Sequence, residues 1–140
     1  MIRAVKAMKQ KKLLGFLADQ DGYIQGLPVE FLGQESSAVT GPATFAQKFK
    51  APVVPVFTHR KPDGVGHVVE ILPPLYYEDT GNEEEDIYRL TEATVRVTED
   101  FIRQHPTEWL WFQHRWNTKL NEIVDIEAKL KVRDAVHAKK

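Results

Sequence analysis

The stretch LLGFLADQDGY, residues 13–23, is an apolar run followed at once by two carboxylates and a glycine. Continuous apolar runs of this length are typical of a strand covered on both faces, so we predict a strand at residues 13–18. Packing alone gives no reason to place two acids at the carboxyl edge of a strand. Asp19 and Asp21 therefore indicate one of three sites: a metal site, a phosphoaspartate, or an acyl-transfer site that they help to polarise.

The composition limits the class of protein. The chain has 140 residues, 42% of them hydrophobic, which is enough for one modest core or part of one. The net charge of −1 gives no reason to propose nucleic acid as a partner, and the absence of cysteine excludes disulfides, thiolate zinc sites and thiol catalysis. There is no apolar run of about 18 residues and no apolar signal-peptide core, so we expect a soluble, cytoplasmic chain.

Hydrophobic spacing along the chain predicts alternating helices and strands, hence an α/β fold. Besides residues 13–18, strands are expected at 28–33, 52–59 and 66–72. Helices are expected at the N-terminus, after a capping Thr40 with Pro42 in the first turn, at 84–104, and from 121 onward. The helix at 84–104 has a stripe that we expect to face the core, formed by Ile87, Leu90, Thr94, Val97 and Phe101.

Two of the three readings of the acidic loop can be compared with known motifs. A calcium loop needs an oxygen ligand at its fifth position and glycine at its sixth, where this chain has Tyr23 and Ile24. An apolar strand ending in Asp-x-Asp-Gly resembles the first motif of haloacid-dehalogenase-type phosphatases, in which the first Asp is the nucleophile and the second the acid/base. That family has Thr where this chain has Tyr23. The phosphatase stays as an alternative.

The third reading comes from several blocks in a fixed order. They are FLADQDG (16–22), VEFLG (29–33), TGPATFAQKFKAPVVPVFTHR (40–60), ILPPL (71–75) and IRQHPTEWLWFQHRWNTK (102–119). Together they resemble the C-terminal half of the bacterial lipid A biosynthesis acyltransferases, the lauroyl and myristoyl transferases of the lysophospholipid/glycerophosphate acyltransferase group. The resemblance implies half of an acyltransferase-type mixed sheet with flanking helices over residues 1–119, followed by an amphipathic tail at 120–140.

The resemblance implies transfer of a fatty acyl chain from acyl carrier protein to a hydroxyl of a lipid A precursor, without a metal or a small cofactor. The general base of that family belongs to a His-x4-Asp/Glu motif. The residues five positions after the first four histidines are Gly64, Leu72, Leu110 and Lys119, and His137 lies too close to the end of the sequence. We therefore expect a fragment that is inactive alone, with the catalytic pair upstream. A non-catalytic lipid- or partner-binding module is the other alternative.

The resemblance also implies supporting residues. Asp19 or Asp21, next to Gly22, would hold an arginine of the missing half that faces the developing oxyanion; a turn capped by the Asp side chains is the alternative. Thr40 and Gly41 would place a helix N-terminus near a substrate phosphate, and the Val and Pro residues of APVVPVF would shape the wall of the acyl site.

The block at 113–119 departs from the family's usual ending, His-Arg-Arg-Trp-Lys-Thr-Arg. Arg115 and Trp116 remain, preceded by His114, but Gln113 and Asn117 replace two basic positions. We keep His114, Arg115 and Trp116 as candidate substrate-binding residues. Because Trp109 and Trp111 alternate, we expect one to face the core and the other a membrane surface or the missing half.

The charge pattern and the missing half suggest partners. Residues 1–12 carry five basic groups and no acid, which suits an acidic carrier protein. The intact protein is expected at the cytoplasmic face of the bacterial inner membrane. If half of the domain is missing, the apolar surface that it would cover is exposed. We therefore expect a homo-oligomer whose interface includes the tail stripe of Ile123, Ile126 and Leu130.

Overall fold

The computed structural model describes residues 2–139 and has helices mixed with short strands, which confirms the α/β class. The helices are α1 (Ile2–Lys9), α2 (Gly41–Phe49), α3 (Glu83–Gln104) and α4 (Ile126–Ala138). The strands β1 (Leu27–Phe31) and β2 (Gln34–Ala38) form one antiparallel sheet, and β3 (Val56–Arg60) and β4 (His67–Ile71) form another. The strands thus pair as two separate hairpins.

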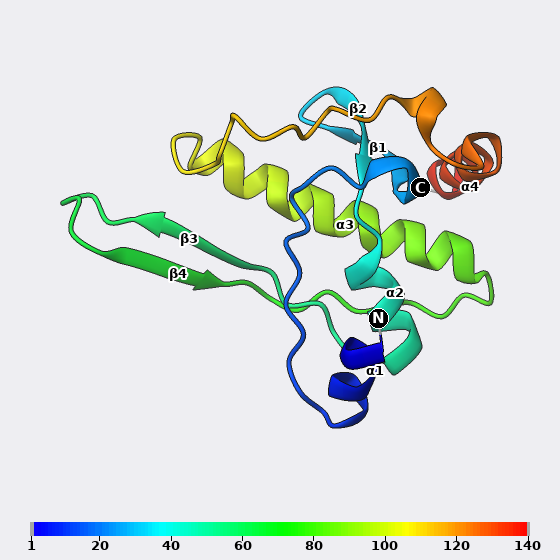
Figure 1. Ribbon diagram of the computed structural model, residues 1–140, viewed down its shortest axis with the longest axis horizontal. Helices are drawn as coiled ribbons and strands as arrows, with labels where there is room; N and C mark the ends of the chain where they lie inside the picture. The colour runs from blue at the N-terminus through cyan, green and yellow to red at the C-terminus, as the bar shows by residue number, and fades with distance from the viewer. Residues whose placement is uncertain (1, 140) are drawn as a thin grey trace.

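Helix α3 organises the molecule. Figure 1 shows it running through the middle, with the β1–β2 hairpin and α4 on one side, α2 on the other, and the β3–β4 hairpin projecting outward. Asn82 caps the helix by accepting a hydrogen bond from the Glu85 backbone N–H, and four acids in the first turn, residues 83–86, suit the helix dipole.

Two faces of α3 are buried. The predicted stripe is confirmed in part, because Leu90 packs with Ala43 and Ala46 of α2. A second stripe, which the sequence analysis missed, places Tyr88, Val95 and Ile102 in the main core. That core is completed by Val29, Phe31, Ala38 and Val136. A helix between two packed layers needs two apolar faces, so one stripe could not describe it.

The expected strand at residues 13–18 is wrong. The segment is irregular, and Leu13 and Leu17 are 102% and 73% exposed. An apolar strand of this kind needs neighbouring strands for its backbone groups and cover on both faces. Among the described residues no strand pairs with this segment, and none of residues 13–18 is buried.

The strand expected at 52–59 is shorter than predicted. Val53 forms only an isolated bridge with Leu75, and the regular strand begins at Val56, after Pro55. Each proline lacks a backbone N–H, which explains the irregular start. The strands at 28–33 and 66–72 are confirmed as β1 and β4, with ends that differ by one or two residues.

The tail helix packs on its own chain. Helix α4 contacts α3 and β1, and its Lys129 donates hydrogen bonds to the carbonyls of Gln25 and Gly26. Val136 is fully buried, whereas Ile126 and Leu130 of the expected stripe are half-buried. Part of the apolar surface expected in an oligomer interface is therefore used inside the molecule, and the homo-oligomer stays a prediction.

Candidate functional site

The acidic loop packs against the tryptophan-rich segment, although ninety residues separate them in sequence. One carboxylate oxygen of Asp19 accepts hydrogen bonds from Trp109 Nε1 at 3.1 Å and from Gln113 Nε2 at 3.2 Å. The structure thus places Asp19, the first of the predicted site residues, against residues 102–119, the last block of the family resemblance. The Asp19 carboxylate links two segments that lie far apart in the sequence.

Asp21 is nearly buried, with 7% of its surface exposed. One oxygen accepts from the Tyr23 backbone N–H at 2.8 Å, as in an Asx turn, and the other from the Thr118 N–H at 2.8 Å. Gly22 follows, and a Cβ there would lie 2.4 Å from the carbonyl oxygen of Ala38. Glycine is therefore required by the close approach of β2. These contacts match the alternative in which the acidic loop is a turn capped by its Asp side chains.

Arg115 is the largest side chain that is fully buried, with 1% exposed. Its Nη1 donates to Ser36 Oγ and, at 2.6 Å, to the Ser37 carbonyl oxygen, and its guanidinium lies 4.5 Å from the centre of the Phe31 ring. Burial lowers the pKa of Arg115 to about 10, against the opposing effect of the Asp21 and Asp19 charges. The group stays charged at neutral pH and is bound to protein atoms, so direct contact with a phosphate would require it to leave this position.

The tryptophans divide as expected between core and surface. Trp109 and Trp116 pack against Phe31 in the main core, with ring centroids 5.6 and 5.7 Å from it. Trp116 also donates from Nε1 to the Phe31 carbonyl at 3.3 Å. Trp111 is 49% exposed, next to Phe112 at 92%. His114 is exposed, which leaves it as the one accessible side chain of the candidate group at 114–116.

Thr40 occupies the N-cap position of α2, but its side chain makes no capping hydrogen bond. Pro42 lies in the first turn, as predicted. A Cβ on Gly41 would lie 2.7 Å from the Phe16 ring, so this ring covers the start of the helix. Thr40 and Gly41 thus lie beside the apolar segment 13–18.

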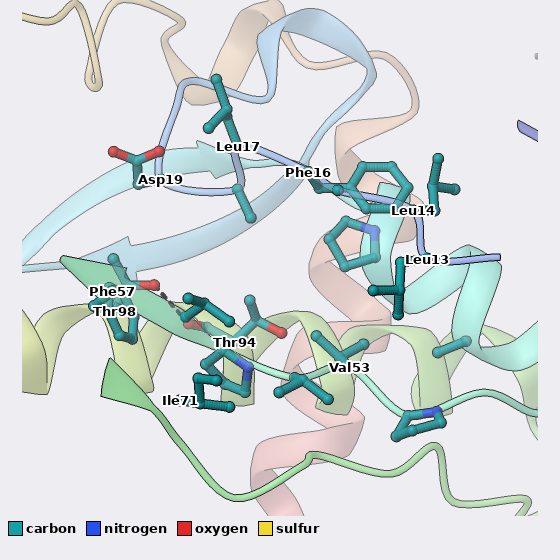
Figure 2. A pocket seen from close by; sticks show the side chains of 18 of the residues that line it. Leu13, Leu14, Phe16, Leu17, Asp19, Val53, Phe57, Ile71, Thr94 and Thr98 are labelled. Carbon is teal, nitrogen blue, oxygen red and sulfur yellow. Dashed lines mark hydrogen bonds between the residues drawn. The ribbon is translucent and has the colours of Figure 1, made fainter. Parts of the chain in front are cut away.

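That segment forms one wall of an apolar cleft of about 790 Å³. Figure 2 shows Leu13, Leu14, Phe16 and Leu17 on one side and Val53, Phe57 and Ile71 on the other. Thr94 and Thr98 of α3 line the cleft between these walls, and Asp19 lies beyond Leu17. The Val and Pro residues at 52–56 line it too, as the resemblance implies for a wall.

Sequence reasoning missed part of this cleft. The residues at 13–17 were assigned to a strand interior, and Thr94 and Phe101 of α3 to the core, whereas all of them line the cleft. A signal was present in Thr94, because a threonine in an otherwise apolar stripe suits a surface that is only partly covered. Among residues 2–139, no helix is both long and apolar enough to cross a membrane.

Comparisons with known proteins agree with the ordered blocks. The chain is 27% identical over 117 residues to the lipid A biosynthesis lauroyltransferase of Escherichia coli K12 and 26% identical over 115 residues to the phosphatidylinositol mannoside acyltransferase of Mycobacterium tuberculosis H37Rv. Each alignment covers 82% of this chain, but only 37% and 34% of those proteins, so the chain spans about a third of the relatives it matches. The model of the family described as bacterial lipid A biosynthesis acyltransferase matches residues 1–118, and the chain belongs to that family.

Proposed function

We propose that this chain supplies the acyl-chain-binding part of an enzyme that moves a fatty acyl chain from acyl carrier protein to a hydroxyl of a lipid A precursor or a related glycolipid. The observation that carries the proposal is the apolar cleft between residues 13–17 and 53–57. Its volume of about 790 Å³ is that of a small-molecule site, and apolar walls suit a hydrocarbon chain. Family membership supports the reaction class.

The cleft has apolar and polar parts, as an acyl donor requires. Leucine, valine and phenylalanine side chains make its walls, and Asp19, Thr94, Thr98 and Glu108 add polar groups. A hydrocarbon tail gains free energy from the apolar walls, whereas a thioester and an acceptor hydroxyl need hydrogen-bonding partners. We propose that the acyl tail lies along the apolar walls and that the acceptor hydroxyl faces Asp19 and Glu108, whose carboxylates can accept its hydrogen. The two threonine hydroxyls already donate to backbone carbonyls of α3.

The surface suits the proposed partners. Helix α1 carries Arg3, Lys6 and Lys9, and acyl carrier protein is acidic, so this helix is our proposed contact for the donor. Leu110, Trp111 and Phe112 are 65%, 49% and 92% exposed. Large apolar side chains in one exposed loop suit the edge of a bilayer, which supports a place at the cytoplasmic face of the inner membrane.

Binding of saturated fatty acids to the 140-residue chain tests the cleft. We expect affinity to rise with chain length by up to about fourfold per methylene, the equivalent of about 0.8 kcal/mol, until the cleft is filled. Ile71→Asp should lower the affinity at least about tenfold, because it places a charge against the hydrocarbon. Competition with a fluorescent fatty acid, with Tm as a check on folding, measures both effects.

The matched control is Val69→Asp, on the same strand. Val69 is 60% exposed, close to the 71% of Ile71, but only Ile71 lines the cleft. Val69→Asp should therefore keep the affinity of the unmodified chain. Equal losses in the two variants, or an affinity independent of chain length, would show that the fatty acid binds elsewhere.

Acyl transfer by the chain alone is expected to stay at background, because no histidine of the sequence has the acid partner five residues on that the family uses. The measurement is transfer of labelled acyl groups from acyl carrier protein to a lipid A precursor, with a complete relative as positive control. Turnover above background would place the general base within these residues and would contradict the assignment of the catalytic pair to an upstream segment.

A further inference from the structure

We propose that His59, Glu70 and His105 form a binding site for one divalent transition-metal ion, Zn²⁺ in the first place, independent of the acyl-binding cleft. His59 is on β3, Glu70 on β4, and His105 follows the last turn of α3. One donor atom from each of the three lies within 4.8 Å of the others. Figure 1 shows the β3–β4 hairpin running outward beside α3, and the three side chains join it to the end of the helix.

The distances suit chelation around one carboxylate oxygen. Glu70 Oε1 is 2.9 Å from His59 Nε2 and 3.7 Å from His105 Nε2. A tetrahedral Zn²⁺ ion at about 2.1 Å from each ligand sets ligand separations of roughly 3.4 Å. The two distances lie on either side of that value, so the separations of the ligand atoms are close to those that one ion sets.

The hydrogen bonds of His59 indicate that a cation belongs between it and Glu70. Its Nδ1 lies 3.0 Å from the Arg60 carbonyl oxygen, which can only accept, so Nδ1 carries a hydrogen. A neutral ring then turns the Nε2 lone pair toward the Glu70 carboxylate, 2.9 Å away. Two electron-rich atoms at that distance need a proton or a metal ion between them.

His105 favours the metal over the proton. A proton joins two atoms, whereas the His105 Nε2 is a third ligand atom, 3.7 Å from the same oxygen. The two imidazole rings stack with centroids 4.2 Å apart and 16° between their planes, so one ring has to turn before both in-plane lone pairs meet at one ion. A metal ion uses all three. The Arg60 carbonyl is then the second-shell acceptor that fixes the tautomer of a ligating histidine.

The frame around the three side chains is held by other contacts. Phe57 of β3 stacks on Phe101 of α3 with centroids 4.4 Å apart, and Arg60 pairs with Glu108 at 3.1 Å. The positions of the ligands therefore do not depend on the metal. The side chains of His59, Glu70 and His105 are 15%, 35% and 26% exposed, which allows an ion to enter and water to complete its coordination.

The ligand set selects the class of ion. Two imidazoles and one carboxylate suit Zn²⁺, Co²⁺, Ni²⁺ or Cu²⁺, whereas Mg²⁺ and Ca²⁺ prefer oxygen alone. Because the ion would join both strands of the hairpin to α3, it would strengthen the attachment that the Phe57–Phe101 and Arg60–Glu108 contacts already provide.

Calorimetric titration of the 140-residue chain with ZnCl₂ tests the site. We expect one ion per chain. His105→Ala and Glu70→Gln each remove a ligand. Each should therefore weaken Zn²⁺ binding by more than the roughly 10- to 100-fold that follows loss of an outer-shell partner. His67→Ala is the matched control, since His67 is on β4 but outside the cluster. Co²⁺ bound to the chain should show the strong visible absorption of a tetrahedral site.

A second readout needs no variant. In the NMR spectrum of the unmodified chain, one equivalent of Zn²⁺ should shift the imidazole signals of His59 and His105 and leave those of His114 and His137 in place. The proposal is overturned if the unmodified chain shows no saturable Zn²⁺ binding. It is also overturned if His105→Ala and Glu70→Gln bind Zn²⁺ as tightly as the unmodified chain. Without saturable binding, the cluster is an ion pair between Glu70 and a protonated His59.

Discussion

Replacing Arg115 by alanine is expected to lower the free energy of unfolding by about 3–5 kcal/mol, the range for truncating a large, fully buried side chain to alanine. The guanidinium is fully buried, bonds to Ser36 and Ser37 of β2, and lies over the Phe31 ring. Its loss leaves a cavity, removes one hydrogen bond each from Ser36 Oγ and the Ser37 carbonyl, and removes the positive charge near Asp21. Urea denaturation followed by circular dichroism measures the change.

Arg103→Ala is the control for loss of an arginine as such. Its side chain is 57% exposed, and its ion pairs with Glu99 and Asp100 are 3.9 and 3.6 Å long, so the loss should stay below about 1 kcal/mol. Arg115→Lys should restore little, because an ammonium is more strongly hydrated than a guanidinium and has no planar face to lie over the Phe31 ring. An Arg115→Ala variant as stable as Arg103→Ala would mean that the buried contacts contribute no net stability.

Replacing Phe31 by alanine is expected to cost a similar amount, about 3–5 kcal/mol, as for other buried aromatic residues. Phe31 is 1% exposed and its ring contacts Trp109, Trp116 and Arg115. Phe112→Ala is the matched control, since Phe112 is 92% exposed and should change stability by less than about 0.5 kcal/mol. Thermal and urea unfolding of both variants measure the difference.

The double variant separates the two contributions. Because Phe31 and Arg115 are in contact, the two losses should not add, and the double-mutant cycle should give a coupling of about 0.5–3 kcal/mol. Strict additivity would show that the guanidinium and the ring stabilise the fold independently, despite their 4.5 Å separation.

Local signals predicted much of the fold. Thr40 with Pro42 correctly indicated the start of α2, and the apolar stripe placed the helix at 84–104, one residue from the start of α3 at Glu83. The element order also agrees, but one strand was assigned to the wrong residues. Residues 13–18 looked like a strand because the run is apolar, whereas β2, QESSA, is polar at its start and was missed. The sequence signal for β2 was Gly33 in the turn before the strand, because a two-residue hairpin turn requires positive φ. In the structure Leu32 and Gly33 have φ of 51° and 79°.

The sequence predicted which blocks contribute to the candidate site, but it did not predict the contacts between those blocks. Nothing local in the sequence indicates that Asp19 accepts from Trp109 or that Asp21 accepts from the Thr118 backbone, since such contacts depend on tertiary packing. The burial of Arg115 was equally hidden, because arginine is seldom fully buried without a partner. The two histidines and the glutamate of the proposed metal site come from a hairpin and a helix end that only the fold brings together.

The packing of the acidic loop and the β1–β2 hairpin against residues 109–136 has a consequence for synthesis on the ribosome. The hairpin itself closes locally, but Ser36 and Ser37 need Arg115, Asp21 needs Thr118, and the main core needs Val136. A nascent chain exposed only as far as residue 100 therefore cannot bury these groups, and contacts this distant in sequence slow folding by their loop-closure entropy. Asp21, Ser36 and Ser37 stay without these partners, and accessible to chaperones, until α4 leaves the exit tunnel.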